Sequence, residues 1–175
     1  EISKAAGDAA VKYVEHASHG NWHFIFLDST VAHSEGAHLT QATLNALETH
    51  LQEAPDTHTL ICLHHQPIAM GSHWLDTMAV DNPDAFFDIT DRHPQIRGIL
   101  WGHVHQQFDG MRNDVRLMST PSTCIQFLPN SRNFALDSAT PGYRWLELHP
   151  DGNIETTVER IEAVTGKVDM ASNGY

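Results

Sequence analysis

The sequence predicts an α/β fold, and three observations lead to this expectation. Two apolar runs of strand length, residues 59–63 and 96–101, are bounded by polar residues, as strands buried on both faces are. Each run follows a segment with features of a helix. Several shorter strand-like segments occupy the last third of the chain. This alternation of strands and helices, followed by a β-rich end, is typical of layered α/β proteins.

The first part of the chain is expected to form a hairpin and a helix. Residues 11–28 predict two strands joined by a turn at Gly20-Asn21, a pair of residues that suits tight turns. Thr40 is placed to cap a helix that ends at Pro55. Three apolar residues recur at helical spacing in that segment: Leu44, Leu47 and Leu51.

The rest of the chain alternates loops, one more helix and strands. After a long loop, Asn82-Pro83 predicts the N-cap and first position of a helix that runs to about Arg92. Beyond residues 96–101, short strands are expected at residues 115–118, 123–127, 143–148 and 154–160. Asp151-Gly152 is a hairpin turn between the last two strands. Residues 1–164 are interpreted as one domain, and residues 165–175 as a frayed tail.

Composition limits the classes of partner. The chain has 22 acidic and 10 basic residues and a formal charge of -12, which argues against nucleic acid or an anionic membrane as a partner. No apolar stretch approaches the roughly 20 residues that cross a bilayer, and no signal peptide is visible. Cys62 and Cys124 lie in apolar segments, so we expect buried, reduced thiols in a cytoplasmic protein.

Histidines follow both strongly predicted strands. His64-His65 ends the first, and Gly102-His103-Val104-His105 ends the second. Ligands bind at the carboxyl ends of strands in such folds, and neutral imidazole is the commonest metal-ligand side chain. Either motif alone also fits ordinary core or loop histidines. A turn after Gly102 would let both later rings converge on one centre or reach two adjacent centres, so the combination predicts a metal site.

The order of these motifs resembles the calcineurin-like metallophosphoesterases, and within them the bacterial class III cyclic-AMP phosphodiesterases. The resemblance extends from about Trp22 to Arg160. The segments that carry it are Leu27-Asp28-Ser29, Leu63-His64-His65-Gln66-Pro67, Gly102-His103-Val104-His105-Gln106, Pro121-Ser122-Thr123-Cys124-Ile125-Gln126-Phe127, Pro141-Gly142-Tyr143-Arg144 and Leu146-Glu147-Leu148-His149-Pro150-Asp151-Gly152.

The resemblance implies a fold and a set of roles. The fold would be the C-terminal half of a β-sandwich of mixed sheets flanked by helices. His64 and His103 would be ligands of one metal ion, and His105 a ligand of its neighbour, the two ions being Fe, Mn or Zn. His65 would be the catalytic residue close to the substrate phosphate. The parent enzyme would hydrolyse 3',5'-cyclic AMP to 5'-AMP.

The chain departs from the family upstream of these motifs. The family's D-x-H, G-D and G-N-H-D motifs are missing, and Gly7-Asp8 has no strand before it. A truncated product, consistent with a start at Glu1 rather than Met, is the simplest interpretation. Three histidines without a bridging carboxylate are not expected to hold two dications, so this chain is predicted to be nearly inactive. Strand edges without neighbours are expected to make it a homo-oligomer.

Two other functions stay open from the sequence. The parent enzyme could act on another diester, such as a glycerophosphodiester. The chain could instead be a naturally short, non-catalytic relative that binds a metal or a partner protein. Asp28 is interpreted as a turn residue, Trp74 and Trp101 as packing residues, and Cys124 as an inert buried thiol.

Overall fold

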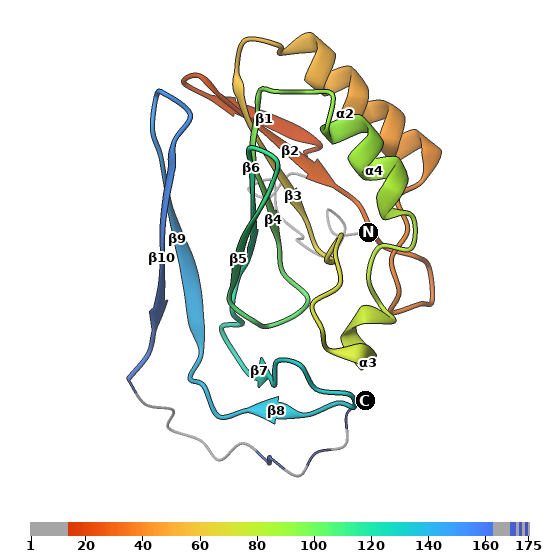
Figure 1. Cartoon of the computed structure of the whole chain (residues 1–175), viewed down its shortest axis with the longest axis vertical. Coiled ribbons are helices and arrows are strands. Elements are labelled where there is room, and N and C mark those ends of the chain that lie inside the picture. Colours follow the sequence, from red (N-terminus) through yellow and green to blue (C-terminus); the bar gives the residue numbers. More distant parts are fainter. Residues whose placement is uncertain (1–13, 163–168, 171, 173, 175) are drawn as a thin grey trace, which may run out of the picture.

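A mixed six-stranded sheet forms the centre of the computed structural model, which describes residues 14–162, 169, 170, 172 and 174. Its strands in chain order are β1 (His16–His19), β2 (Trp22–Leu27), β3 (His58–Leu63), β4 (Ile96–Trp101), β5 (Phe108–Arg112) and β6 (Val115–Ser119). Their order across the sheet is β1-β2-β3-β4-β6-β5 (Figure 1). The inner strands β2, β3, β4 and β6 run parallel, while β1 and β5 add antiparallel edges. The predicted α/β class is confirmed.

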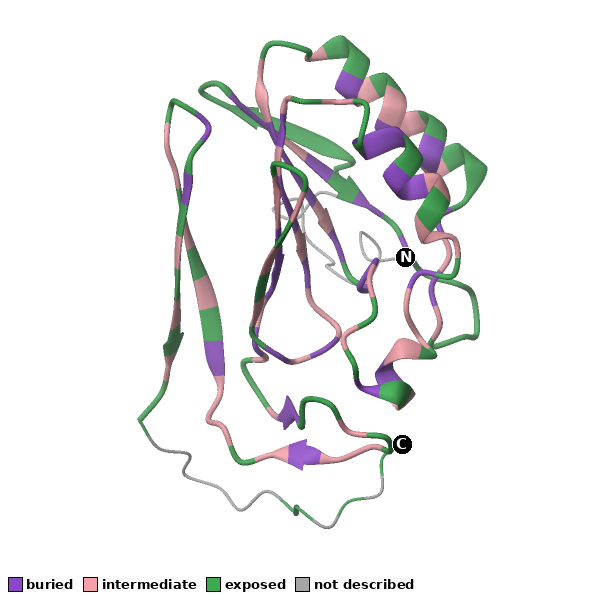
Figure 2. Cartoon of the chain, in the orientation of Figure 1, coloured by how far each residue is buried: buried purple, intermediate pink, exposed green. Residues whose placement is uncertain are grey.

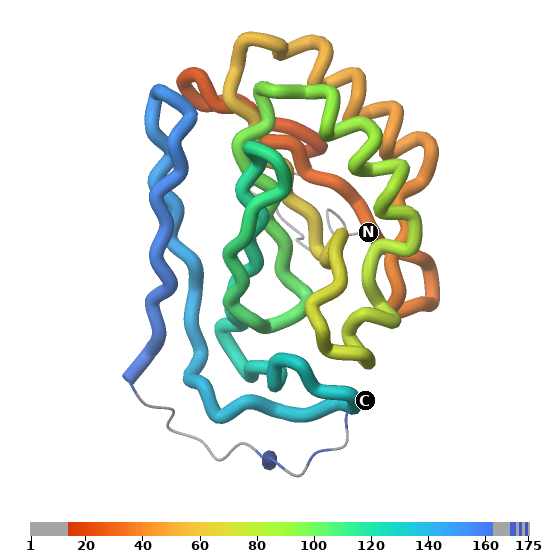
Figure 3. The backbone as a smooth tube through the Cα atoms, viewed as in Figure 1, coloured from red at the N-terminus to blue at the C-terminus, as the bar shows by residue number. Residues whose placement is uncertain are grey.

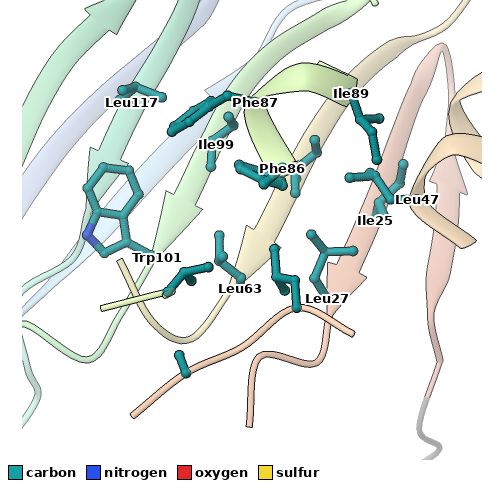
Figure 4. Close-up of a cluster of buried hydrophobic side chains, with 14 of the residues drawn as sticks. Ile25, Leu27, Leu47, Leu63, Phe86, Phe87, Ile89, Ile99, Trp101 and Leu117 are labelled. Carbon is teal, nitrogen blue, oxygen red and sulfur yellow. The ribbon is translucent and has the colours of Figure 1, made fainter. Parts of the chain in front are cut away.

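Two helices cover one face of this sheet. They are α2 (Gln41–Glu53) and α4 (Pro83–Thr90), and both lie on the same side in Figure 1. The main core lies between these helices and the strands. Figure 4 shows Leu47 of α2 beside Ile25 of β2, with Phe86 of α4 close by. Because all three side chains are at most 1% exposed, this layer fixes the helices on the sheet.

A hairpin lies on the opposite face. It consists of β9 (Gly142–Leu148) and β10 (Ile154–Arg160), and Figure 3 shows it beside the sheet on the side away from the helices. Ile154 packs with Trp22, Leu60 and Met118 in a smaller core. Exposed and partly buried residues alternate along the hairpin in Figure 2, so this face is less completely covered than the helical face.

The predicted hairpin and first helix are present, but β1 begins only at His16, later than the expected start of the hairpin. The β1–β2 hairpin turns at Gly20, whose φ of 59° lies in the left-handed region that glycine favours. The Thr40 Oγ1 atom accepts a hydrogen bond from the Thr43 backbone N–H at 3.1 Å and so caps α2. Residues 11–13, Gly7-Asp8 and most of the predicted tail lie outside the described residues.

Three predictions about local structure are corrected. Helix α4 ends at Thr90, two residues before the expected end. Asn82 occupies its N-cap position, but its side chain instead bonds both backbone groups of Leu39, the N–H at 3.0 Å and the carbonyl at 2.8 Å. The strand expected at residues 123–127 is only β7 (Gln126–Phe127).

Three short elements were not predicted from the sequence. They are α3 (His73–Asp76), β5 and β8 (Leu136–Asp137). Strand β5 lacks apolar alternation because Asp109 and Gly110 interrupt it, and only its pairing with β6 makes it a strand. Elements whose stability comes from tertiary contacts carry little local signal.

The cysteine prediction holds only in part. Both cysteines are free, as expected, but Cys124 is exposed and Cys62 is only partly buried. The expectation of a buried Cys124 is therefore wrong, because β7 begins two residues later and residues 122–125 form a bent surface segment. None of the helices in the described part of the chain combines the length and apolar character that crossing a membrane requires.

Candidate metal centre

The two histidine motifs lie side by side at the ends of neighbouring parallel strands. Leu63 of β3 pairs with Trp101 of β4, so the residues that follow them meet at the same edge of the sheet. There the Gly102 backbone N–H donates to the His64 carbonyl at 3.1 Å. The predicted juxtaposition of the two motifs is confirmed.

A tight turn brings His103 and His105 to one side of the chain. Their φ angles of 49° and 48° lie in the left-handed region, which costs a non-glycine residue on the order of 1–2 kcal/mol. Between them, Val104 is fully buried in the main core. Burial of Val104 fixes the turn, and both imidazoles then line the same cavity. Strain of this kind is concentrated at functional sites.

Three of the imidazoles converge closely. One ligand atom from each of His64, His65 and His103 lies within 4.8 Å of the other two. The His64 Nε2 and His103 Nδ1 atoms are 3.3 Å apart. This spacing matches that of nitrogens that share one metal ion, since Zn–N bonds are about 2.0–2.1 Å long.

The fourth imidazole, His105, lies on the wall of the same cavity. Its ring stacks on Phe127 of β7, with the ring centres 4.3 Å apart and the planes 4° from parallel. Trp74 of α3 packs edge-on against the same phenyl ring at 4.9 Å. Within the described residues, the buried Nδ1 of His105 and the buried Nε2 of His103 have no hydrogen-bond partner. Both nitrogens are therefore available to a ligand.

The cavity between these elements has a volume of about 320 Å³. It is lined by the four histidines and by Glu35, Trp74, Leu75, Met78 and Phe127. Glu35 is the only carboxylate among these described lining residues. The wall is thus largely aromatic and apolar, with neutral nitrogen donors at its base.

Ser29 holds His65 in place. Its Oγ lies 2.8 Å from the His65 Nδ1, and it accepts a second, longer bond from the His65 backbone N–H at 3.4 Å. A hydroxyl can both donate and accept, so this bond forms with either tautomer of the His65 ring. Ser29 is 1% exposed and His65 6% exposed, so water does not compete for this bond.

Burial keeps the four rings neutral. Desolvation first, and then His64, lower the pKa of His65 to about 4, against the opposing effects of the Glu35 backbone and the Asp28 carboxylate. Desolvation, followed by the neighbouring rings, lowers the pKa of His103 to about 3. Desolvation also lowers the pKa of His64 and of His105. Neutral imidazole is the form that binds metal ions, so the site is prepared for them at neutral pH.

Some residues in or beside the cavity have roles that the sequence did not predict. Ser29 lies in one of the motifs, but its contact with His65 was not expected. The parallel register pairs Leu27 with Leu63, so Ser29, two residues after Leu27, lies opposite His65. This pairing is the feature from which the contact of Ser29 with His65 could have been predicted. Phe127 also lies in one of the motifs, but its place in the cavity wall was not predicted. Trp74 packs as expected, but it also lines the cavity.

Two structural interpretations are confirmed. The Asp28 Oδ1 atom accepts hydrogen bonds from the Thr30 backbone N–H at 2.9 Å and from the Thr30 hydroxyl at 2.7 Å, as a turn residue does. Trp101 is 1% exposed and belongs to the main core.

Known proteins are similar to this chain over most of its length. Over 156 residues, or 89% of this chain, the sequence is 42% identical to the 3',5'-cyclic adenosine monophosphate phosphodiesterase CpdA of Pseudomonas aeruginosa. It is 44% identical over 155 residues to CpdA of Vibrio vulnificus and 41% identical over 154 residues to CpdA of Escherichia coli. The chain is thus similar to cyclic-AMP phosphodiesterases over most of its length. No protein-family model matches it.

The chain spans a little over half of these relatives, since it covers 57%, 57% and 56% of their lengths. Solved structures agree on the fold. A dimetal phosphatase from Danio rerio superposes with a TM-score of 0.52 at 13% identity, covering 81% of this chain and 58% of its own. GAP50 of Plasmodium, described as the anchor in the inner membrane complex, gives 0.55 at 14% identity, covering 83% and 48%. The expected metallophosphoesterase architecture is confirmed.

Proposed function

We propose that the protein containing this chain hydrolyses 3',5'-cyclic AMP to 5'-AMP with two bound metal ions. His64 and His103 are ligands of one ion, His105 is a ligand of the other, and His65 lies beside the substrate phosphate. One observation carries the proposal: four neutral imidazoles from two strand ends line a single cavity, two of them with nitrogens 3.3 Å apart. The relatives are named as 3',5'-cyclic adenosine monophosphate phosphodiesterases, which supports cyclic AMP as the substrate.

The donor set fits transition-metal ions. The His105 Nδ1 is buried without a partner among the described residues, which is unfavourable unless a ligand binds it. Imidazole donors suit Zn and Fe better than Mn, which prefers oxygen ligands. When bound, such ions supply Lewis-acid polarisation of the phosphoryl group and activation of water. They also provide positive charge that an acidic chain of net charge -12 otherwise lacks.

His65 has a separate role in this proposal. In the tautomer in which the Ser29 hydroxyl donates to Nδ1, the Nε2 atom carries the ring proton and donates a hydrogen bond to a phosphate oxygen. The low pKa of His65, about 4, keeps this ring neutral beside the cationic centre. The aromatic wall made by Trp74 and Phe127 excludes water from one side of the reacting phosphate.

The test uses the complete protein. Turnover of cyclic AMP, cyclic GMP and a glycerophosphodiester is measured with added Mn(II) or Fe(II), and cyclic AMP is expected to be preferred. His64→Ala, His103→Ala and His105→Ala should each lower cyclic-AMP turnover by at least about 100-fold. His19→Ala changes an exposed histidine of β1 and serves as the control. Variants that retain activity within about threefold of the control would contradict the assignment, and preference for the glycerophosphodiester would favour the alternative substrate.

The 175-residue chain alone is proposed to be nearly inactive. Among the described cavity residues, the single carboxylate is Glu35, which is exposed, so little negative charge is present to hold two dications together. The measurement is cyclic-AMP hydrolysis by this chain with added Mn(II). Turnover comparable to that of a full-length relative would refute this part of the proposal.

A further inference from the structure

A second group of three imidazoles lies near the start of β2, whereas the candidate metal centre lies beyond its end. His16 belongs to β1, His23 to β2 and His50 to the last turn of α2. We call these residues the edge cluster, because β1 is the edge strand of the sheet. None of its members belongs to the family motifs of the sequence analysis.

The fold brings the three rings together from segments distant in sequence. In the β1–β2 hairpin, His16 pairs with Ile25 and His23 pairs with Ser18. Side chains two positions apart share a face of a strand, so His16 and His23 lie diagonally on the same face as Ile25. Helix α2 packs on that face, where Ile25 contacts the main core, and its last turn places His50 over the two strand histidines.

Two of the rings, one buried and one partly buried, have no hydrogen-bond partners among the described residues. His23 is 4% exposed, and neither of its ring nitrogens has a hydrogen-bond partner among the described residues. The same holds for both nitrogens of His50, whose side chain is 14% exposed. Buried polar groups in native proteins are satisfied by protein, water or an ion, and four unpaired nitrogens in one place call for a ligand.

The ring spacing matches a shared metal ion. The ring centres are 5.4 Å apart for His16 and His23, 4.3 Å for His16 and His50, and 6.2 Å for His23 and His50. Imidazoles bound at about 2.0–2.1 Å around a tetrahedral ion have ring centres roughly 5 Å apart. The spacing is close to that of the candidate metal centre, where it is 4.6–5.2 Å.

The ring nitrogens of the edge cluster do not all point toward one common position in the structure. Among the described residues, two groups have ligand atoms that all lie within 4.8 Å, and the edge cluster is not one of them. Rotating an imidazole by 180° about its Cβ–Cγ bond exchanges carbon and nitrogen positions and leaves the ring centre almost in place. Ring flips of this kind can therefore direct nitrogens to a common point without moving the backbone.

Two carboxylates complete a ligand set. The Glu15 Oε2 atom lies 4.0 Å from the His50 Nε2, and the Glu53 Oε2 atom lies 3.8 Å from the His50 Nδ1. Glu15 and His50 also line a cavity of about 160 Å³ between β2 and α2, which gives an ion a route of entry. Burial and the neighbouring rings lower the pKa of His23, so it is available as a neutral donor.

We propose that the edge cluster is a structural Zn²⁺ site, in which His16, His23 and His50 provide three nitrogens and Glu15 or Glu53 provides the fourth ligand. A four-coordinate site with protein ligands only is closed, so it has a stabilising and not a catalytic role. The ion joins the edge strand β1 to helix α2. This proposal does not depend on the phosphodiesterase activity.

The test removes the competing site first. In the His64→Ala/His103→Ala background, Zn²⁺ binding to the full 175-residue chain is followed by calorimetry, and Co²⁺ binding by visible absorption. One equivalent of Zn²⁺ is expected, with tetrahedral Co²⁺ bands. Adding His50→Gln or His16→Gln should weaken binding at least tenfold and abolish the Zn²⁺-dependent rise in melting temperature.

A matched control is available on the same strand. His19→Gln changes an exposed β1 histidine on the opposite face from His16, and it should leave both readouts unchanged. Circular dichroism of the apo variants establishes that the substitutions leave the fold intact. The proposal is refuted if the background protein binds no Zn²⁺ at submillimolar concentrations, or if His50→Gln and His16→Gln bind it as tightly as His19→Gln does.

Discussion

Removing the Ser29 hydroxyl should destabilise the chain through one buried hydrogen bond. In Ser29→Ala, the His65 Nδ1 loses its partner at 2.8 Å, and the His65 backbone N–H loses its weaker partner at 3.4 Å. Both side chains are at most 6% exposed, so water does not replace the hydroxyl. A buried group left without a partner costs about 1–3 kcal/mol.

We therefore expect a loss of about 2 kcal/mol in the free energy of unfolding. For a chain of this size, that corresponds to a fall in melting temperature of about 4–8 °C. The measurement is urea and thermal unfolding of the metal-free chain at pH 7.5, followed by circular dichroism. Metal is left out because ligand binding would add its own stabilisation.

Ser138→Ala is the matched control, since Ser138 is an exposed serine outside the strands and helices. Surface substitutions of this kind usually change stability by less than about 0.5 kcal/mol. If Ser29→Ala matches Ser138→Ala within that margin, the buried bond does not exist in solution. The role of Ser29 in holding the His65 ring would then lose its basis.

Three further outcomes are expected. Burial lowers the pKa of His65 to about 4 and that of His103 to about 3, so the unfolded state binds more protons than the folded state below about pH 6.5. The free energy of unfolding should therefore fall as the pH drops from 6.5 towards 3. A His65→Gln/His103→Gln variant should show a flatter pH dependence in urea titrations. Gly152→Ala should lower the free energy of unfolding by about 1–3 kcal/mol, because the φ of Gly152 is 85° and the new Cβ would lie 2.6 Å from the His58 Nδ1. The control Gly36→Ala, whose Cβ would have no neighbour closer than 3.4 Å, should lower it far less in the same unfolding assay. Light scattering should show a dimer, since the hairpin face is incompletely covered, and a monomer at all concentrations would count against this expectation.

The strands that build the candidate site could be predicted from the sequence because they are buried. Residues 59–63 and 96–101 form uninterrupted apolar runs, and the structure places strands there with bounds within one residue of those expected. Their parallel pairing follows from the connecting helix, and it brings His64 and His103 together. The pairing of these two distant segments could thus be predicted from their local sequence patterns, at the strand ends where the candidate site lies.

Elements defined by tertiary contacts could not be predicted in this way. The stacking of His105 on Phe127 depends on β7, which has only two residues and no strand pattern of its own. That segment is shaped by a side chain, because the Gln126 Nε2 donates to the Ser122 carbonyl at 2.8 Å and its Oε1 accepts from the Ser122 N–H at 3.1 Å. Such a loop is specified by contacts that residue spacing does not reveal.

The charge of the candidate site bears on how many metal ions this chain alone is expected to bind. Two dications about 4 Å apart repel each other by roughly 17 kcal/mol at an effective dielectric constant of about 20. Neutral imidazoles such as His64 and His103 provide ligand bonds but no charge to offset this repulsion. Glu35, the one carboxylate among the described lining residues, is exposed and therefore strongly screened. We therefore expect the strand ends of this chain to hold at most one ion, and a closely spaced pair to need carboxylates from outside the described cavity.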